Sequence, residues 1–339
     1  MRHLSADTAP SRRTFLAAAG LTMAAAAVPS GLPAQTSMRI DVHHHFAPPA
    51  YRDALASRLP APLLPWTAER SIAEMDASGV RAAVLSITAP GLFFGDAAAT
   101  RALARACNDD GARIVRDHPG RFGLFAALPM PDVDATLAEI AYAFDTLKAD
   151  GVTLYTSYGN RWLGDASFAP VFAELDRRRA VVFTHPITNA CCASLAGLPP
   201  AAIEYGADTT RTIANYVFTG AAAQHPNVRM IFSSAGGTMP FLIERFDVMM
   251  RDPKVAANVP AGIRATLARF SYDVSQAANP EAMGALTTLV PVSQVLFGTD
   301  YPFRGIAEHV ANLRSCGFDD AQRRAIEHDN PARLFTRFA

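Results

Sequence analysis

The stretch Ile40-Asp41-Val42-His43-His44-His45 ends a short apolar run that begins at Met38, and it places two histidines two residues apart. Successive side chains of a β-strand point to opposite faces, so a strand here puts His43 and His45 on one face and His44 on the other. Imidazole is a common ligand of divalent metal ions. We therefore interpret His43 and His45 as candidate metal ligands. An isolated His-x-His is also typical of a polar strand end, so further ligands have to come from elsewhere in the chain.

Short apolar runs rich in β-branched and aromatic residues recur along the chain and predict eight strands. These runs are Arg39–His43, Ala82–Thr88, Phe122–Leu128, Gly151–Thr156, Ala180–His185, Val228–Ser233, Phe270–Val274 and Gln294–Asp300. Longer amphipathic stretches between them predict helices at Thr100–Asp117, Asp132–Lys148, Ala166–Arg178, Thr209–Gln224, Met239–Met250, Pro280–Leu289 and Ile306–Leu313. This alternation predicts an α/β protein with a TIM-type (β/α)8 barrel. An open doubly wound sheet is the alternative, but no glycine-rich phosphate loop follows the first strand.

Three predicted strands end in side chains that can bind a metal ion. His43 and His45 end the first strand, His185 ends the fifth and Asp300 ends the eighth. In a TIM-type barrel the carboxyl ends of the strands carry the active site, so these side chains are expected to meet. Singly, His185 could bond a loop carbonyl and Asp300 could cap a turn. Together, three imidazoles and one carboxylate form a candidate metal site with room for water or substrate, as in catalytic centres.

Length and composition predict one large globular domain over residues 38–339. The chain has 339 residues, of which 50% are hydrophobic and 18% charged, so disorder is not expected. The 31 basic and 31 acidic residues balance, and no basic cluster outside the N-terminus indicates a nucleic-acid interface. The four cysteines show no Cys-x-x-Cys spacing and predict no disulfide framework. A small-molecule partner fits this composition better than a nucleic acid.

Residues 1–37 have the features of an export signal followed by a linker. The pair Arg12-Arg13 precedes an Ala-rich apolar stretch that reaches Val28 and is followed by Pro29. This order is typical of a bacterial twin-arginine signal and predicts an exported, periplasmic protein. A general secretory signal or a buried helix are the alternatives. The apolar stretch is short and rich in alanine, so no stable membrane insertion is expected after the signal is removed.

Several motifs together resemble the amidohydrolase-related (amidohydrolase 2) metal enzymes, from about residue 38 to the end. Within this family the chain is similar to the branch that contains aminocarboxymuconate semialdehyde decarboxylase and 6-methylsalicylate decarboxylase. The resemblance rests on Asp41–Pro49, Ser86–Gly91, Asp150–Tyr155, Thr184-His185-Pro186, Ala235–Phe241, Leu296–Pro302 and Asn330–Phe335.

The resemblance implies a (β/α)8 barrel of the metal-dependent hydrolase superfamily with one divalent ion, zinc or alternatively manganese. The implied ligands are His43, His45, His185 and Asp300. The implied reaction is the non-oxidative decarboxylation of a small aromatic or unsaturated carboxylic acid. A divalent ion serves hydrolysis as well as decarboxylation, so a hydrolase of a lactone, ester or amide is the second hypothesis.

The chain departs from the family pattern at Ser234. Members of the family typically carry a histidine directly before Ala-Gly-Gly, and here the order is Ser234-Ala235-Gly236-Gly237. A serine donates a hydrogen bond but does not titrate near neutral pH, and losing a general acid or base typically costs ~10²–10⁴-fold in rate. We expect Ser234 and Asp300 to be the catalytic residues, with Asp300 carrying the acid–base role. A third hypothesis is a protein that binds metal or ligand without catalysis.

Other residues are candidates for substrate binding. Arg245 lies eleven residues after Ser234, and the resemblance implies that it crosses a homodimer interface to bind the substrate carboxylate. A surface ion pair with Glu244 or Asp247 is the alternative. The remaining pocket candidates share a predicted loop or strand end, with core packing as the alternative for each: Phe46, Trp66, Thr88, Phe93, Phe94 and Tyr158.

Overall fold

Eight parallel strands form the central sheet of the computed structural model, which describes residues 39–188 and 195–339. The strands are β1 (Arg39–His45), β2 (Val80–Ser86), β3 (Phe122–Ala127), β4 (Gly151–Tyr155), β7 (Val181–His185), β8 (Arg229–Phe232), β9 (Ser271–Asp273) and β10 (Val295–Leu296). Their side chains are almost all buried, as expected for parallel strands that are covered on both faces. The predicted export signal and the Cys191-Cys192 pair lie outside the described residues.

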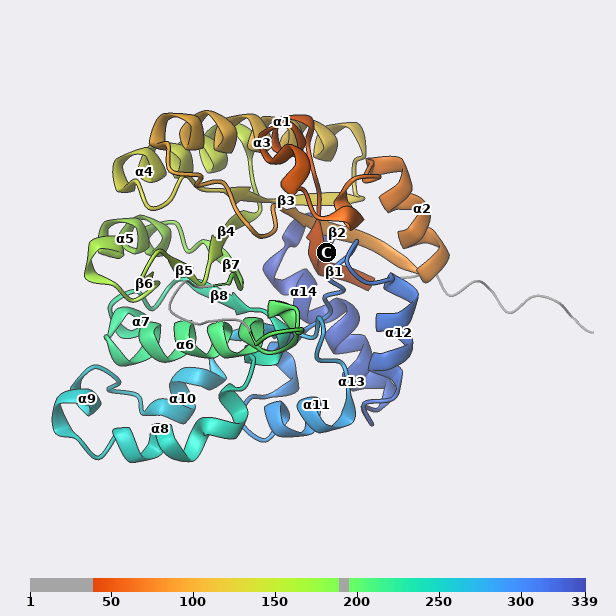
Figure 1. Cartoon of the computed structure of the whole chain (residues 1–339). Helices are drawn as coiled ribbons and strands as arrows, with labels where there is room; N and C mark the ends of the chain where they lie inside the picture. The colour runs from red at the N-terminus through yellow and green to blue at the C-terminus, as the bar shows by residue number, and fades with distance from the viewer. Residues whose placement is uncertain (1–38, 189–194) are drawn as a thin grey trace, which may run out of the picture. The chain divides into compact units, whose positions relative to one another are not determined.

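The strands follow one another around a closed barrel in the order β1-β2-β3-β4-β7-β8-β9-β10 (Figure 1). The barrel closes where the chain beyond β10 runs beside β1. The Val42 N–H donates to the Phe297 carbonyl at 3.0 Å, and the Asp300 N–H donates to the His43 carbonyl at 2.8 Å. These bonds leave no open sheet edge at this seam, so the predicted (β/α)8 barrel is confirmed and the doubly wound sheet is excluded.

Helices surround the barrel and connect most of its strands (Figure 1). They are α1 (Pro49–Leu55), α2 (Ala68–Ser78), α3 (Ala97–Asp117), α4 (Val133–Ala141), α5 (Ala169–Arg177), α6 (Glu204–Phe218), α7 (Ala221–Gln224), α8 (Ile243–Met249), α9 (Pro253–Ala257), α10 (Ile263–Ala268), α11 (Pro280–Thr287), α12 (Ile306–Arg314), α13 (Asp320–Arg324) and α14 (Asn330–Leu334). Each of the seven predicted amphipathic stretches overlaps at least one of them. Within the described ranges, no helix is both long and apolar enough to cross a membrane.

Helix α3 shows how local sequence sets these elements. The Asp96 carboxylate accepts the Ala99 N–H at 3.0 Å and caps the first turn. Gly111 then faces β3, where an added Cβ would lie 2.6 Å from Leu124 Cδ1. Only glycine permits this close approach, so Gly111 brings the helix onto the strand that it covers.

The barrel interior is apolar at one end and polar at the other. In the middle of the barrel, Phe125 and Phe183 stack with ring centroids 5.2 Å apart, and the Phe183 ring also contacts His43. Phe335 and Phe338 at the end of the chain pack against the same cluster. The buried polar side chains gather at the carboxyl-terminal end, among them His43, His45, His185 and Asp273. The functional site is therefore expected at the carboxyl-terminal end of the barrel.

Each predicted strand overlaps an observed one, but the boundaries differ by one to four residues, and two of these differences lie at candidate metal ligands. β1 continues through His45 instead of ending at His43, and β10 ends at Leu296, four residues before Asp300. Asp300 has a φ of 63°, so the chain leaves the extended conformation there. A short hairpin of β5 (Ser157–Tyr158) and β6 (Arg161–Trp162) was not predicted, because two-residue strands carry no periodic signal.

Candidate metal centre and substrate pocket

The four predicted metal ligands converge at the carboxyl-terminal end of the barrel. Their ligand atoms all lie within 4.8 Å of one another. His43 Nε2 lies 3.1 Å from His45 Nε2, and Asp300 Oδ1 lies 3.1 Å from His45 Nε2. Side chains from β1, from the end of β7 and from the loop after β10 thus meet, as predicted from the strand ends. Together they form a divalent-metal site: His43, His45, His185 and Asp300.

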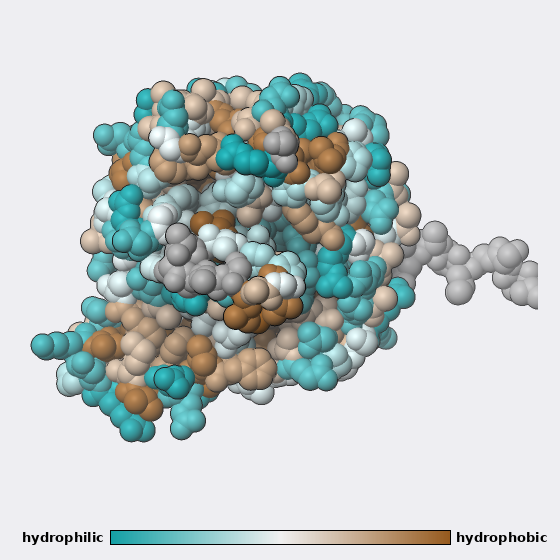
Figure 2. All heavy atoms as spheres, in the orientation of Figure 1, coloured by the Kyte–Doolittle hydropathy of each residue, from teal (hydrophilic) through white to brown (hydrophobic). Residues whose placement is uncertain are grey.

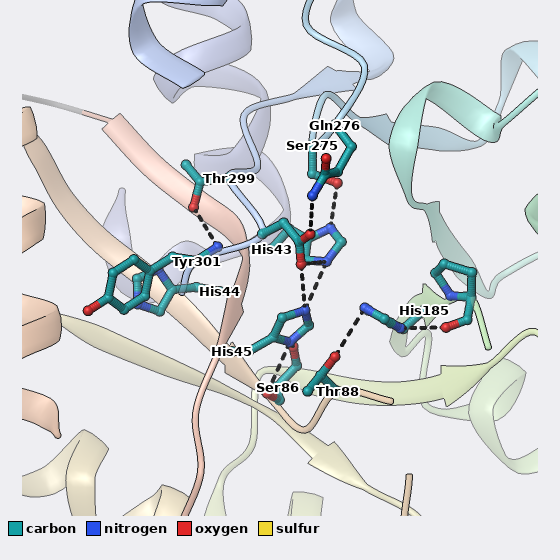
Figure 3. Close-up of polar contacts among 12 residues, drawn as sticks. His43, His44, His45, Ser86, Thr88, His185, Ser275, Gln276, Thr299 and Tyr301 are labelled. Carbon is teal, nitrogen blue, oxygen red and sulfur yellow. Dashed lines mark hydrogen bonds and ion pairs between the residues drawn. The ribbon is translucent and has the colours of Figure 1, made fainter. Parts of the chain in front are cut away.

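The outer nitrogen of each imidazole is held by an oxygen acceptor, and Figure 3 shows this for His45 with Ser86 and for His185 with the neighbouring carbonyl group. The three contacts are His43 Nδ1 to Asp273 Oδ2 at 2.9 Å, His45 Nδ1 to Ser86 Oγ at 3.0 Å and His185 Nδ1 to the Pro186 carbonyl at 2.7 Å. When Nδ1 donates, the neutral ring carries its lone pair on Nε2. Three Nε2 lone pairs therefore point into one space, and this donor set fits a divalent cation.

The two carboxylates beside His43 favour a positive charge on that ring, whereas the other two imidazoles of the cluster are held neutral. Burial lowers the pKa of His43, but Asp273 and Asp300 outweigh it and raise that pKa to about 10. Burial and the neighbouring imidazoles lower the pKa of His185 well below its usual value. Burial raises the pKa of Asp300, but the hydrogen bonds from His43 and His45 lower it well below the usual range. The carboxylate is thus ionised, and a metal ion and a proton compete for the same imidazoles.

Asp273, at the end of β9, is the main supporting residue and was not predicted. Its Oδ2 faces His43, and its Oδ1 accepts the backbone N–H groups of Ser234 at 3.1 Å and Ser275 at 2.9 Å. The Ser275 hydroxyl lies 2.8 Å from His43 Nδ1. Asp273 lies within the predicted strand Phe270–Val274, so the strand-end reasoning that selected His185 would also have found it.

Ser234 lies on the wall of the site, directly after β8. It begins a turn of four consecutive residues with positive φ, Ser234 to Gly237. Its hydroxyl lies 3.5 Å from that of Ser275, which contacts His43. The serine is therefore close to the metal ligands.

His44 points away from the metal site. Its ring nitrogens contact Asp41 Oδ2 at 3.0 Å and Ser71 Oγ of α2 at 2.7 Å. The ring stacks on Tyr301 at a centroid distance of 4.6 Å (Figure 3). The predicted alternation along β1 is confirmed, and His44 joins the barrel to the helix layer.

A cavity of about 700 Å³ is lined by three of the four metal ligands, His43, His185 and Asp300. Figure 2 shows its mouth as a hollow in the middle of the face. The polar part of its wall includes His43, Thr88, His185, Ser234, Gln276 and Asp300, and the apolar part includes Pro60, Pro186, Pro199, Pro200, Ile203 and Phe303. Among the described residues, no lysine or arginine lines it. A small, mostly apolar ligand fits such a site.

Of the residues predicted to bind substrate, Thr88 lies in the cavity wall, whereas Phe46 and Trp66 lie in the core. Thr88 lines the cavity, with its hydroxyl 3.3 Å from His185 Nε2. Phe46 and Trp66 were expected in the pocket, but they are buried in the core with ring centroids 5.9 Å apart. The reason is that the chain turns into α1 after β1 and carries Phe46 beneath the loop, against Gly111 of α3.

Three further aromatic candidates also lie outside the cavity lining: Phe93, Phe94 and Tyr158. Arg245 is exposed on α8, also outside that lining. It forms no ion pair with a described residue, and Asp247 instead pairs with Arg264 at 2.7 Å.

Comparison with known proteins gives the family. Residues 40–337 match the amidohydrolase family model. The chain is 36% identical over 323 residues to the decarboxylase yanB of Aspergillus niger, and the alignment covers 88% of each chain. It is 37% identical over 316 residues to the 6-methylsalicylic acid decarboxylase of Penicillium expansum, covering 88% of this chain and 96% of that one.

A solved structure shares the fold over almost its whole length. It is the 5-carboxyvanillate decarboxylase of Novosphingobium aromaticivorans complexed with manganese and 4-hydroxy-3-methoxy-5-nitrobenzoic acid. The two superpose with a TM-score of 0.80 at 22% identity, covering 89% of this chain and 97% of the other. With the family match over residues 40–337, this chain belongs to the amidohydrolase family.

Proposed function

We propose that this protein is a metal-dependent, non-oxidative decarboxylase of a small aromatic or unsaturated carboxylic acid. The observation that carries the proposal is the cluster of three imidazoles and one carboxylate at the floor of a largely apolar cavity. Relatives that are 36% and 37% identical over most of their length are decarboxylases, one of them of 6-methylsalicylic acid. Both the site and the relatives therefore support the same class of reaction.

The ion proposed for the site is zinc, with manganese as the alternative. Three imidazole nitrogens and one carboxylate oxygen are a typical zinc donor set. Manganese is the ion bound in the solved 5-carboxyvanillate decarboxylase. A bound divalent ion would supply a Lewis acid that binds and polarises the oxygen atoms of the substrate. Elemental analysis of protein purified without added metal distinguishes the two ions.

Residues of the chain supply the other functions of the site, which are substrate binding, exclusion of water and proton transfer. The apolar wall, with Phe303 and Pro200, holds the ring and excludes water. Decarboxylation breaks one carbon–carbon bond, releases CO₂ and leaves an electron pair on a carbon that must take up a proton. We assign this step to Asp300, whose ionised carboxylate would first accept a proton from water or from the substrate and then pass it to that carbon. We assign a hydrogen bond to the substrate to Ser234, because both residues line the cavity.

We further propose that the active unit is a homodimer. No basic side chain of the described residues lines the cavity, so within one chain the proposed metal ion is the cation available to the substrate carboxylate. Arg245 on α8 is exposed and lies beside a surface that carries the exposed apolar residues Phe241, Val248 and Met249. Apolar atoms are visible over this part of the surface in Figure 2. Sedimentation velocity of wild type and Phe241→Glu tests the dimer, and kinetics of Arg245→Ala test the carboxylate contact.

A second candidate function is the hydrolysis of a lactone, ester or amide at the same site. The observation that favours it is Ser234, which replaces a group that titrates in the decarboxylase branch with one that does not. Hydrolysis consumes water and releases no CO₂, so the two reactions are distinguished by their products. A protein that binds acids but converts none of them is the third outcome.

Export by the twin-arginine route is also proposed, from Arg12-Arg13 and the apolar stretch that follows. This route carries folded proteins, which suits a protein that takes up its metal before export. Replacing both arginines by lysine should leave the protein in the cytoplasmic fraction of a host with this pathway.

The central experiment is a substrate screen with metal-loaded protein. The panel contains 6-methylsalicylate, 2,6-dihydroxybenzoate, 5-carboxyvanillate and several aromatic lactones, with CO₂ release and product formation measured together. We expect CO₂ release from at least one acid, and none from His185→Ala. Lactone opening without CO₂ release from any acid would overturn the decarboxylase assignment in favour of the hydrolase.

A further inference from the structure

The two oxygens of Asp300 have different surroundings. Oδ1 faces the imidazoles, 3.1 Å from His45 Nε2 and 3.4 Å from His43 Nε2. Oδ2 points away from them and accepts a hydrogen bond from Gln276 Nε2 at 2.6 Å. This short contact joins a pocket-lining amide from the loop after β9 to a metal ligand from the loop after β10.

The orientation of the Gln276 amide is set by a second partner. Gln276 Oε1 accepts a hydrogen bond from Arg304 Nη1 at 3.0 Å, and the other terminal nitrogen of Arg304 pairs with Glu308 of α12. Rotating the amide by 180° would place its oxygen against the Asp300 carboxylate and its NH₂ group against the guanidinium. Both contacts would be repulsive, so Arg304 keeps the amide donor directed at Asp300.

The backbone of Gln276 is fixed as well. Its φ is 57°, in the left-handed region that non-glycine residues rarely adopt. Its N–H donates at 3.0 Å to Nε2 of His309, a buried histidine of α12. Helix α12 thus holds the main chain of Gln276 and, together with Arg304, its side chain.

We propose that Gln276 is a positioning residue for the metal centre, and that Arg304 acts through it. By holding Oδ2, Gln276 keeps Oδ1 of Asp300 turned toward the three imidazoles, so the carboxylate is preorganised as a ligand. Gln276 is a neutral donor, so it fixes the carboxylate without cancelling its charge. This inference rests on the metal site described under the proposed function, and it adds the group that orders the carboxylate of Asp300 among the four ligands.

The test is the affinity of the purified protein for Mn²⁺, measured by competition with a chelator, together with the electron paramagnetic resonance spectrum of the bound ion. Gln276→Leu keeps the size of the side chain and removes the donor. Gln276→Gly removes the same donor and also relieves the left-handed strain. Both should bind Mn²⁺ about 10- to 100-fold more weakly, with a changed spectrum, because partners of this kind contribute affinity on that scale.

Two further variants distinguish positioning from a general structural role. Arg304→Ala should weaken Mn²⁺ binding in the same direction, and adding it to Gln276→Leu should cause no further loss, because it acts through the same contact. Thr238→Val removes another polar group from the wall of the same cavity, away from Asp300, and should keep the wild-type affinity.

The possible results distinguish failure of the positioning role of Gln276 from failure of the metal site. Wild-type affinity and spectrum in both Gln276 variants would overturn the positioning role and leave the site intact. Failure of the wild-type protein to bind Mn²⁺ or Zn²⁺ would overturn the metal centre and this inference with it. Independent, additive losses for Gln276→Leu and Arg304→Ala would contradict the claim that Arg304 acts through Gln276.

Discussion

Asp273 Oδ2 lies 2.9 Å from Nδ1 of His43, while its other oxygen accepts the backbone N–H groups of two serines in the neighbouring loops. One buried carboxylate therefore orients a metal ligand and joins the loops after β8 and β9. Such carboxylate–histidine pairs fix the tautomer of the ligand and raise its basicity.

Asp273→Asn should weaken metal binding about 10- to 100-fold, because the amide replaces one acceptor oxygen with a donor. The affinity is measured by competition with a chelator for Zn²⁺ or Mn²⁺. Ser86→Ala is the matched comparison at His45, where the Ser86 carbonyl at 3.3 Å remains as an acceptor for Nδ1. It should show a smaller loss, and equal losses in the two variants would contradict the special role of Asp273.

His185→Ala and Asp300→Ala should each abolish retention of the metal without unfolding the barrel. Each removes one of four ligand groups and leaves the apolar core clusters of the barrel unchanged. Elemental analysis gives the metal content, and circular dichroism gives the fold. His225→Ala is a matched histidine variant outside the cluster and should keep the metal. Wild-type metal content in the first two variants would refute the ligand assignment.

Ser234→His should raise the rate of decarboxylation by about tenfold or more, since a general acid or base typically contributes ~10²–10⁴-fold. The position has a φ of 53°, which histidine and asparagine adopt more readily than most residues. Ser234→Asn is therefore the control, because it has a similar backbone preference and no titrating group. A rate for the histidine variant at or below wild type would indicate that the serine serves a different reaction.

Gly237→Ala should destabilise the fold by about 2 kcal/mol or more, as judged from urea unfolding. Its φ is 66°, and an added Cβ would lie 2.0 Å from the carbonyl oxygen of Gly206 in α6, so the wall of the cavity would have to move. Gly317→Ala shares the positive φ, 78°, but its Cβ would meet nothing within 4 Å. It should cost only about 1 kcal/mol, the usual backbone term. Similar losses in both would show that the contact with Gly206 is unimportant.

Glu174→Gln should lower stability at neutral pH by up to about 1 kcal/mol, and this difference should disappear in acid. Hydrogen bonds from Arg177 and Arg178 lower the pKa of Glu174 to about 2. Because the folded pKa lies below the unfolded value, its contribution is full above that value, about 4.5, and is lost as the pH falls toward 2. Urea unfolding at pH 7, 4 and 3 measures the difference. Glu244→Gln, which removes no ion pair with a described residue, should match wild type throughout, and a pH-independent effect of Glu174→Gln would contradict this explanation.

Most of the metal site was predictable because it depends on local periodicity. A strand directs alternate residues to one face, so His43 and His45 were separated from His44 without knowledge of the fold. The barrel rule then selected His185 and Asp300 at the ends of distant strands. The same rule applies to Asp273, which lies near the end of a predicted strand. The sequence did not indicate, however, that this aspartate contacts His43.

The sequence by itself determined the barrel, its strand order and the residues that converge at its carboxyl-terminal end, because hydrophobic periodicity and strand direction are local properties. Only the tertiary structure decided which side chains of the loops face the cavity. Phe46 and Trp66 turned into the core, whereas Gln276 reached Asp300 across two loops. Loop side chains have no fixed period, so their direction depends on the packing of segments far apart in the chain.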